Sequence, residues 1–350
     1  MNIHEKYIKR CIEIAKNGLG TTAPNPMVGC VIVHDQIIIG EGFTSPYGGP
    51  HAEVNAIHSV KDASLLNQAT LYVTLEPCSH FGKTPPCADL INKFKIPKVV
   101  IGTIDTHSKV AGKGVQLLKA SGCEVIVGLL EREVKAHHKR FFTFHNKKRP
   151  YIILKWAESA DGFLAPQTRN EQKPFWITNE LSRQLVHKWR TEEQAILVGT
   201  QTVIEDNPSL TARDWAGKNP IRVVLDKNSR LPDEAAIFDN KASTILISGK
   251  VEPRSTKHKR DKTEFLDWNL KQNIAQQICT ILYNNDINSI IIEGGRQTLQ
   301  TFINENLWDE ARIFTGATTF YAGTKAPSIS GTLISDEKII DDILRIYRND

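Results

Sequence analysis

The sequence predicts two consecutive α/β domains, and three observations support this fold class. The chain has 350 residues, enough for two domains at roughly 100–200 residues each. Short runs rich in Val and Ile alternate with amphipathic segments along its length, as in sheets covered by helices. Hydrophobic residues make up 40% and charged residues 24%, a composition typical of a folded globular protein rather than a disordered one.

The first half alternates helices and strands. An amphipathic helix is predicted at 5–17, followed by a hairpin whose strands, 28–33 and 37–39, are joined by a turn at 34–36. The later elements are helices at 52–60, 87–94 and 114–121 and strands at 69–75, 99–104 and 124–129. Together they predict a mostly buried sheet.

The stretch 131–149 is basic and aromatic, and the strand pattern restarts after Pro150, so we place the domains at 1–147 and 148–350. A terminal helix running into a polar linker explains this composition, and a nucleic-acid-binding segment is the alternative. The charged stretch 249–264 is predicted to be a solvated loop. The elements of the second half are strands at 151–157, 195–198, 221–225, 243–247, 289–292 and 310–315, and helices near 179–190, 270–284 and 296–306.

The charge balance and the cysteines limit the possible classes of protein. A net charge of +5 is weak for a nucleic-acid binder of this length and suits an anionic small molecule equally well. No apolar run approaches the ~18–20 residues that span a bilayer, and the charged amphipathic start is unlike a signal peptide. Six cysteines are too few for a disulfide scaffold. We therefore expect a cytoplasmic protein that binds neither membrane nor nucleic acid.

Three residues have the chemistry of zinc ligands. Pro50 is predicted at the first helical position, which places His51 in the first turn of a helix. Cys78 follows a strand, and Cys87 opens another helix. One His and two Cys leave a fourth tetrahedral position for water, as in catalytic zinc sites. Glu53, two residues after His51, is the expected proton shuttle. The order H-x-E, P-C and a second Cys resembles that of the zinc deaminases.

The spacing of the cysteines separates this chain from nucleoside and nucleic-acid deaminases, which generally carry P-C-x-x-C. Here eight residues separate Cys78 from Cys87. The segment PCSHFGKTPPC, with His51-Ala52-Glu53 and the upstream PNPMVG, resembles the deaminase of bacterial riboflavin synthesis. The resemblance implies a cytidine-deaminase-like three-layer domain. By the same resemblance, the deaminase substrate would be contacted by Asn25, His80, Lys83, Asp105 and His107, the last of which departs from the family's usual Asn.

The second half shows only a weak cofactor signal of its own. It has no G-x-G-x-x-G motif after a strand, which disfavours a Rossmann domain. A buried strand does run into Gly294-Gly295 and a helix, where a helix N-terminus could hold phosphate. An ordinary tight turn is the alternative.

Three further blocks resemble the reductase of the same bifunctional family: KWAESADG, WIT and GTQTVIEDNPSLTAR. They imply a dihydrofolate-reductase-like domain that uses NADPH. Lys155 and Glu293 are the candidates for polarising or protonating the sugar. The implied NADPH contacts are Glu158, Trp176, Thr202, Asp206, Gly295, Arg296, Gln297 and Thr298. The implied substrate contacts are Pro174, Arg190, Leu210, Arg213 and Glu293. Glu158 and Pro174 depart from the family pattern, which has a small residue and a Ser there.

The sequence thus predicts a bifunctional enzyme of riboflavin biosynthesis. It would deaminate 2,5-diamino-6-(5-phosphoribosylamino)pyrimidin-4-one with zinc and then reduce the ribosyl group to ribityl with NADPH. We also expect a homo-oligomer, either a dimer or a tetramer. Three alternatives stay open at this point: a nucleoside or tRNA deaminase with a C-terminal binding domain, a protein whose zinc is only structural, and a deaminase whose second domain has lost reduction.

Overall fold

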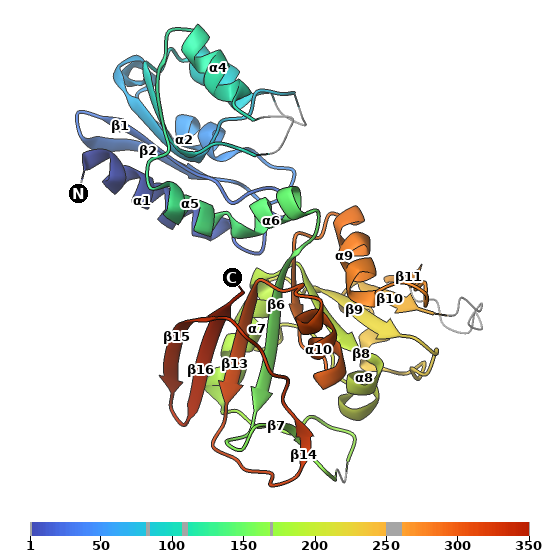
Figure 1. The fold of residues 1–350 in the computed structure, drawn as a ribbon. Coiled ribbons are helices and arrows are strands. Elements are labelled where there is room, and N and C mark those ends of the chain that lie inside the picture. The colour runs from blue at the N-terminus through green and yellow to red at the C-terminus, as the bar shows by residue number, and fades with distance from the viewer. Residues whose placement is uncertain (1, 82–84, 107–110, 169–170, 250–260, 350) are drawn as a thin grey trace. The chain divides into compact units, whose positions relative to one another are not determined.

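The structure is a computed structural model that describes residues 2–81, 85–106, 111–168, 171–249 and 261–349. It divides into two compact units, Met1–Lys148 and Arg149–Asp350. Each unit has a large sheet and a hydrophobic core of its own (Figure 1). The predicted α/β class is confirmed. Within the described ranges, no helix is long and apolar enough to cross a membrane.

The first unit is built on a five-stranded sheet of order β2-β1-β3-β4-β5. The strands are β1 (Gly29–His34), β2 (Ile37–Phe43), β3 (Thr70–Leu75), β4 (Lys98–Thr103) and β5 (Glu124–Val127). β1 is antiparallel to β2 and β3, whereas β3, β4 and β5 are parallel to one another. The loops that leave β3 and β4 therefore start next to each other at one edge of the sheet, the usual place for a site in such folds.

Helices cover both faces of this sheet. α2 (Ala52–Ser59), α3 (Cys87–Lys93) and α4 (Lys113–Ala120) pack on one face, and α1 (Ile3–Ala15) and α5 (Glu131–His137) pack on the other (Figure 1). Cys30 and Ile32 of β1 belong to the first core, and Val31 and Val33 belong to the second. This alternation buries the strands on both sides and explains their almost continuous apolar sequences. The remaining helices of the unit are η1 (Lys16–Gly18), η2 (Ala63–Gln68) and α6 (Lys139–Lys147).

The second unit has a nine-stranded sheet of order β11-β10-β9-β8-β12-β6-β13-β16-β15. Neighbouring strands from β11 to β13 are parallel, and β16 and β15 continue the sheet antiparallel. The strands are β6 (Tyr151–Glu158), β8 (Ala195–Gly199), β9 (Ile221–Asp226), β10 (Thr244–Ser248), β11 (Thr263–Asp267), β12 (Ser289–Ile292), β13 (Glu310–Thr315), β15 (Thr332–Ile339) and β16 (Asp342–Arg348).

Helices cover both faces of this sheet as well. α9 (Ile274–Asn284) and α10 (Arg296–Asn304) pack on one face, and α7 (Glu180–Glu192) and α8 (Thr200–Asp206) pack on the other. A short helix, η3 (Ala236–Phe238), lies on the face of α8. A separate two-stranded sheet pairs β7 (Phe163–Pro166) with β14 (Gly323–Lys325) (Figure 1).

Several predicted elements were wrong or incomplete. α2 begins at Ala52, so Pro50 lies outside the helix, and His51 is the N-cap with an extended ψ of 165°. The strand β11 starts at Thr263, inside the predicted loop 249–264, of which residues 250–260 lie outside the described residues. The basic stretch 131–149 forms two helices, α5 and α6. The sequence did not predict β7, α8, β14, β15 and β16, nor the short helices η1, η2 and η3.

A buried ion pair fixes the start of the second unit. The guanidinium of Arg149 donates to both carboxylate oxygens of Asp309, at 2.5 and 2.8 Å, and the backbone N–H of Ile152 donates to the same carboxylate at 2.9 Å. The side chains of the pair are only 9% and 8% exposed. The ion pair therefore holds the chain at the start of β6 next to Asp309, the residue that precedes β13.

We expect Asp309→Ala to lower the free energy of unfolding of the second unit by about 3–5 kcal/mol, because it leaves the buried Arg149 charge without a partner. All six tryptophans lie at or after Trp156, so denaturant unfolding followed by tryptophan fluorescence reports on this unit alone. Glu171→Ala, which removes an exposed ion pair with Lys173, serves as the control and should leave the midpoint unchanged. A loss for Asp309→Ala below about 1 kcal/mol, typical of surface pairs, would contradict the prediction.

Candidate active sites

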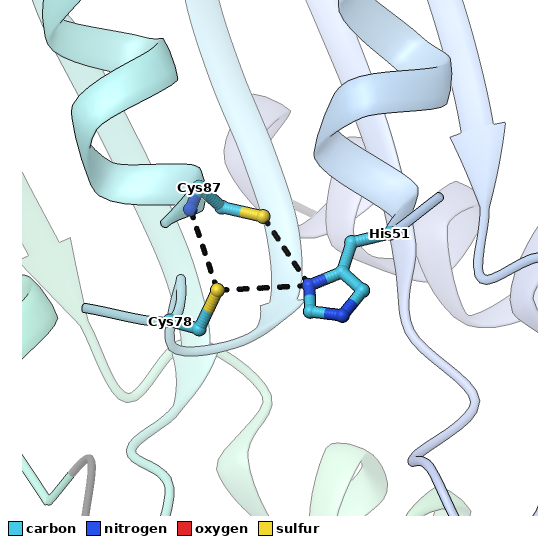
Figure 2. A group of neighbouring side chains, drawn as sticks. All are labelled: His51, Cys78 and Cys87. Carbon is cyan, nitrogen blue, oxygen red and sulfur yellow. Dashed lines mark hydrogen bonds between the residues drawn. The ribbon is translucent and has the colours of Figure 1, made fainter. Parts of the chain in front are cut away.

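The three predicted zinc ligands meet at one edge of the first sheet. His51 caps the N-terminus of α2, Cys78 lies in the loop after β3, and Cys87 is the first residue of α3. The ligand atoms of the three side chains all lie within 4.8 Å of one another. Figure 2 shows both sulfurs directed at the same nitrogen of the His51 ring.

The distances fit a tetrahedral zinc ion. His51 Nδ1 lies 3.6 Å from the Cys78 Sγ and 3.4 Å from the Cys87 Sγ. Zinc bonds of about 2.3 Å to sulfur and about 2.0–2.1 Å to nitrogen, at tetrahedral angles, require an S···N separation of roughly 3.5 Å. The described residues offer these three ligand atoms as a group, which leaves one tetrahedral position for water.

The ionisation of the two thiols also suits a cation. The pKa of the Cys78 thiol falls to about 4, first because the Cys87 thiol donates to it and then because His51 and the backbone N–H of Cys87 stabilise the thiolate. The pKa of the Cys87 thiol is raised by the same thiolate. The pair therefore shares one proton, which a divalent ion would displace on binding.

Glu53 is buried beside this group, with a side chain only 4% exposed in the first turn of α2. Burial, and after it the negative charge of Cys78, raises the pKa of Glu53 to about 7. A carboxyl group in this position can accept and return a proton near neutral pH.

The structure reveals a further buried carboxylate, Glu76, for which no role was predicted from the sequence. It is 4% exposed and accepts hydrogen bonds from the backbone N–H groups of Asp105 and Gly112, at 3.3 and 2.9 Å, and of Gly114 and Val115, at 2.9 and 3.2 Å. Glu76 thus ties the segment after β4 to the loop that carries Cys78. An acidic residue directly after a buried strand was the signal for it.

The predicted contacts of the deaminase substrate differ in how far they are buried. Asp105 is buried at 7% exposure, and Asn25 is half-buried in the loop before β1. His80 is exposed in the loop after Cys78. Lys83 and His107 lie outside the described residues. The contacts of all five with substrate stay predictions.

In the second unit, Lys155, Arg190 and Glu293 come together although they are far apart in the sequence. Lys155 lies on β6, Arg190 on α7, and Glu293 directly after β12, the neighbour of β6. Arg190 forms a two-pronged ion pair with Glu293, at 2.8 and 3.3 Å, and Lys155 Nζ lies 4.0 Å from the same carboxylate. All three side chains are at most 15% exposed.

These charges shift one another's ionisation. Burial raises the pKa of Glu293, but the positive charges of Arg190 and Lys155 outweigh it and lower the pKa to about 2. Burial lowers the pKa of Lys155, with Glu293 acting in the opposite direction. The cluster holds two cations and one anion, so it carries a net positive charge.

The segment predicted to bind substrate lies next to this cluster. Arg190 Nη1 donates to the carbonyl oxygen of Thr211 at 3.1 Å. Thr211 lies in the sequence between two predicted substrate contacts, Leu210, which is 3% exposed, and Arg213, which is half exposed. The neighbouring His187 on α7 lies 3.0 Å from Asp214, and burial, with Arg190 and Arg213 after it, lowers the pKa of His187 to about 4. His187, which lies one turn before Arg190, was not predicted from the sequence.

Several predicted NADPH contacts surround the carboxyl ends of β8 and β12. The hydroxyl of Thr202 on α8 accepts a hydrogen bond from the N–H of Gly295, the N-cap of α10, at 3.1 Å. Arg296, Gln297 and Thr298 form the first turn of α10, whose unpaired N–H groups and dipole favour an anion. These residues form a compact group at the same edge as Glu293.

The other predicted NADPH contacts lie on separate segments. The carboxylate of Glu158, at the end of β6, accepts from the indole N–H of Trp156 at 2.8 Å. Trp176 is 54% exposed and packs under the Arg183 guanidinium, 4.8 Å from its ring. Asp206 ends α8, and Pro174 is half-buried in the segment before α7. Their roles stay predictions.

Comparisons with known proteins assign each half of the chain. Residues 1–103 match the family described as the cytidine and deoxycytidylate deaminase zinc-binding region. Residues 150–338 match the family described as the RibD C-terminal domain. Riboflavin biosynthesis protein RibD of Aquifex aeolicus is 40% identical over 89% of this chain and 86% of its own length. The chain belongs to the RibD family. RibD of Bacillus amyloliquefaciens is likewise 40% identical, over 93% and 88% of the two chains.

Solved structures agree with this assignment. One is a diaminohydroxyphosphoribosylaminopyrimidine deaminase/5-amino-6-(5-phosphoribosylamino)uracil reductase from Thermotoga maritima, with a TM-score of 0.89 at 38% identity and 99% coverage of both chains. RibD of Acinetobacter baumannii gives 0.86 at 32% identity, also with 99% coverage of both. The predicted order, a cytidine-deaminase-like domain before a reductase domain, is confirmed, as is a bifunctional deaminase and reductase of riboflavin biosynthesis. Because residues 150–338 match the RibD C-terminal domain, the alternative of a nucleoside or tRNA deaminase with a C-terminal binding domain is not supported.

The buried Glu293 of this RibD chain predicts a specific response to acid. Because its folded pKa of about 2 lies below the ordinary value of 4.5, it stabilises the fold above pH 4.5, and this stabilisation is lost as the pH falls from 4.5 towards 2. We expect Glu293→Gln to be less stable than the parent at pH 7 and to lose less further stability across this window. Tryptophan-monitored denaturation at a series of pH values measures both. Parallel pH profiles for parent and variant would contradict the assignment.

Proposed function

We propose that residues 1–147 hydrolytically deaminate 2,5-diamino-6-(5-phosphoribosylamino)pyrimidin-4-one and that residues 148–350 reduce the ribosyl group of the resulting uracil to ribityl with NADPH. The observation that carries the first half is the group of His51, Cys78 and Cys87 beside the buried Glu53. The similar protein from Thermotoga maritima is named for a deaminase and a reductase of the same two kinds.

In the deaminase, His51 Nδ1 and the two cysteine thiolates would hold zinc. Bound zinc supplies a Lewis acid that activates water for attack on the amino-bearing ring carbon. Glu53 accepts a proton from the water and returns it to the departing amino group, so that water and a C–NH2 group become a carbonyl and ammonia. Burial of Glu53 excludes bulk water from this transfer.

Glu53→Gln tests this role, because the amide keeps the shape of the side chain and cannot shuttle the proton. We expect ammonia release to fall by about 10²–10⁴-fold, the usual contribution of a general acid–base group. Zinc content and NADPH oxidation on the uracil ribotide should remain those of the parent. Glu124→Gln, which changes a surface carboxylate of the same unit, is the matched control. Ammonia release at the parental rate from Glu53→Gln would overturn the mechanism.

In the reductase, the cluster of Lys155, Arg190 and Glu293 would face the sugar. NADPH supplies the hydride, and the opened sugar carbonyl or imine needs one proton in return. Lys155, a buried amine whose pKa is lowered by burial, suits this donation, and Glu293 holds it in place. The half-exposed guanidinium of Arg213 would pair with phosphate oxygens, and Arg190, which is paired with Glu293, would add positive charge beside it.

Lys155→Met tests the donation, because methionine keeps most of the side-chain length without the charge. We expect NADPH oxidation on the uracil ribotide to fall by about 10²–10³-fold while ammonia release from the diaminopyrimidine ribotide stays unchanged. Lys271→Met, an exposed lysine of the same unit, is the control. Equal rates for Lys155→Met and the parent would remove Lys155 from the reaction.

The compartment and the assembly belong to the same proposal. The six cysteines are free, five of them buried, which suits a reducing cytoplasm. We retain the expectation of a homo-oligomer, a dimer or a tetramer, and light scattering of the purified chain measures it.

A further inference from the structure

Glu76 occupies a position between the zinc ligands and the segment after β4. It directly follows β3 and precedes Pro77 and Cys78. The four N–H groups that its carboxylate accepts belong to Asp105, Gly112, Gly114 and Val115, which are 29 to 39 residues away along the chain. Two strands of the sheet that are neighbours in space thus have their following loops joined by one side chain.

Through three of these bonds, Glu76 caps the N-terminus of α4, although it lies on a different segment of the chain. α4 starts at Lys113, and its N-cap Gly112 has a positive φ of 82° and offers no side chain. The carboxylate accepts the N–H groups of the buried Gly114 and Val115, which lie in the first turn of the helix and have no partner within it, and also that of the half-buried Gly112. Its negative charge also complements the positive end of the helix dipole.

A close backbone contact requires the same arrangement. A Cβ atom added at Gly114 would lie 2.1 Å from the carbonyl oxygen of Pro77. The first turn of α4 therefore packs against the main chain that leads into Cys78. This backbone contact fixes the position of the first turn of α4 relative to Cys78, because no side chain separates Gly114 from Pro77.

The fourth hydrogen bond holds Asp105, one of the predicted contacts of the deaminase substrate. Asp105 lies two residues after β4, its backbone N–H donates to Glu76 Oε2, and its side chain is buried. We propose that Glu76 is a positioning residue of the deaminase, which holds Asp105 and the start of α4 at a fixed place relative to the zinc ligands. In this way it orients Asp105 towards the ribosyl part of the substrate. The inference deepens the proposed deaminase function and rests on it.

Glu76→Gln separates positioning from catalysis. The amide oxygen still accepts hydrogen bonds, but the amide NH2 faces N–H groups that need an acceptor, so about half of the bonds are lost. We expect amide hydrogen exchange at residues 105, 112, 114 and 115 to become about tenfold faster or more, with no change in β3. Unchanged exchange at these amides would overturn the proposal without any assay of activity.

The kinetic arm uses the full chain loaded with zinc. For ammonia release from the diaminopyrimidine ribotide, we expect Glu76→Gln to raise KM about tenfold while kcat changes by less than about threefold. Zinc content and NADPH oxidation should match the parent, and Glu124→Gln again serves as the control. Gly114→Ala, which pushes the same turn away from Pro77, should raise KM in the same way.

The outcomes are distinguishable. Loss of zinc, or a fall in kcat with KM unchanged, would show that Glu76 supports the metal loop and would overturn its role in orienting Asp105. Normal folding and zinc content with no ammonia release by the parent chain would instead contradict the proposed deaminase function itself.

Discussion

The pairing of parallel strands whose carboxyl ends lie side by side is the constraint on which both candidate sites depend. In the first unit, β3 and β4 are parallel neighbours, so the loop with Cys78 and the segment with Asp105 begin at the same edge. In the second unit, β6 and β12 are parallel neighbours, and they deliver Lys155 and Glu293 to one place. A helix that follows a strand begins at the carboxyl edge of its sheet and carries the chain back to the opposite edge. His51 and Cys87 therefore lie at this edge of the first sheet, and the first turn of α10 lies at this edge of the second sheet.

This constraint also explains which residues the sequence could predict. The zinc ligands and Glu53 occur in short motifs, whose chemistry is legible before any contact is known. The buried strands are long apolar runs and were found at nearly their observed bounds; β12 was predicted at 289–292 and observed there. The site residues most readily identified are those whose role is fixed by neighbours in sequence.

The features that were missed depend on distant contacts. Glu76 is one acidic residue after a strand, and its four donors come from another segment, which no local pattern reveals. His187 resembles any polar residue on an amphipathic helix until Asp214 is placed beside it. β15 lies at the edge of its sheet and is exposed almost throughout, so it lacks the apolar alternation by which a strand is recognised. Its pairing with β16 decides its conformation instead.

The two sites handle buried charge in different ways, and the difference follows from their chemistry. The first unit places two thiols and an imidazole together, a set that only a cation or a shared proton can stabilise. The second unit buries Lys155, Arg190 and Glu293 as a cluster of ion pairs with an excess positive charge. A cluster of this kind is stable without a ligand because each charge has an opposite neighbour, and its excess charge favours an anionic substrate. Each site is composed of residues from its own unit, with its own core. A substitution that disturbs one core should therefore leave the geometry of the other site intact.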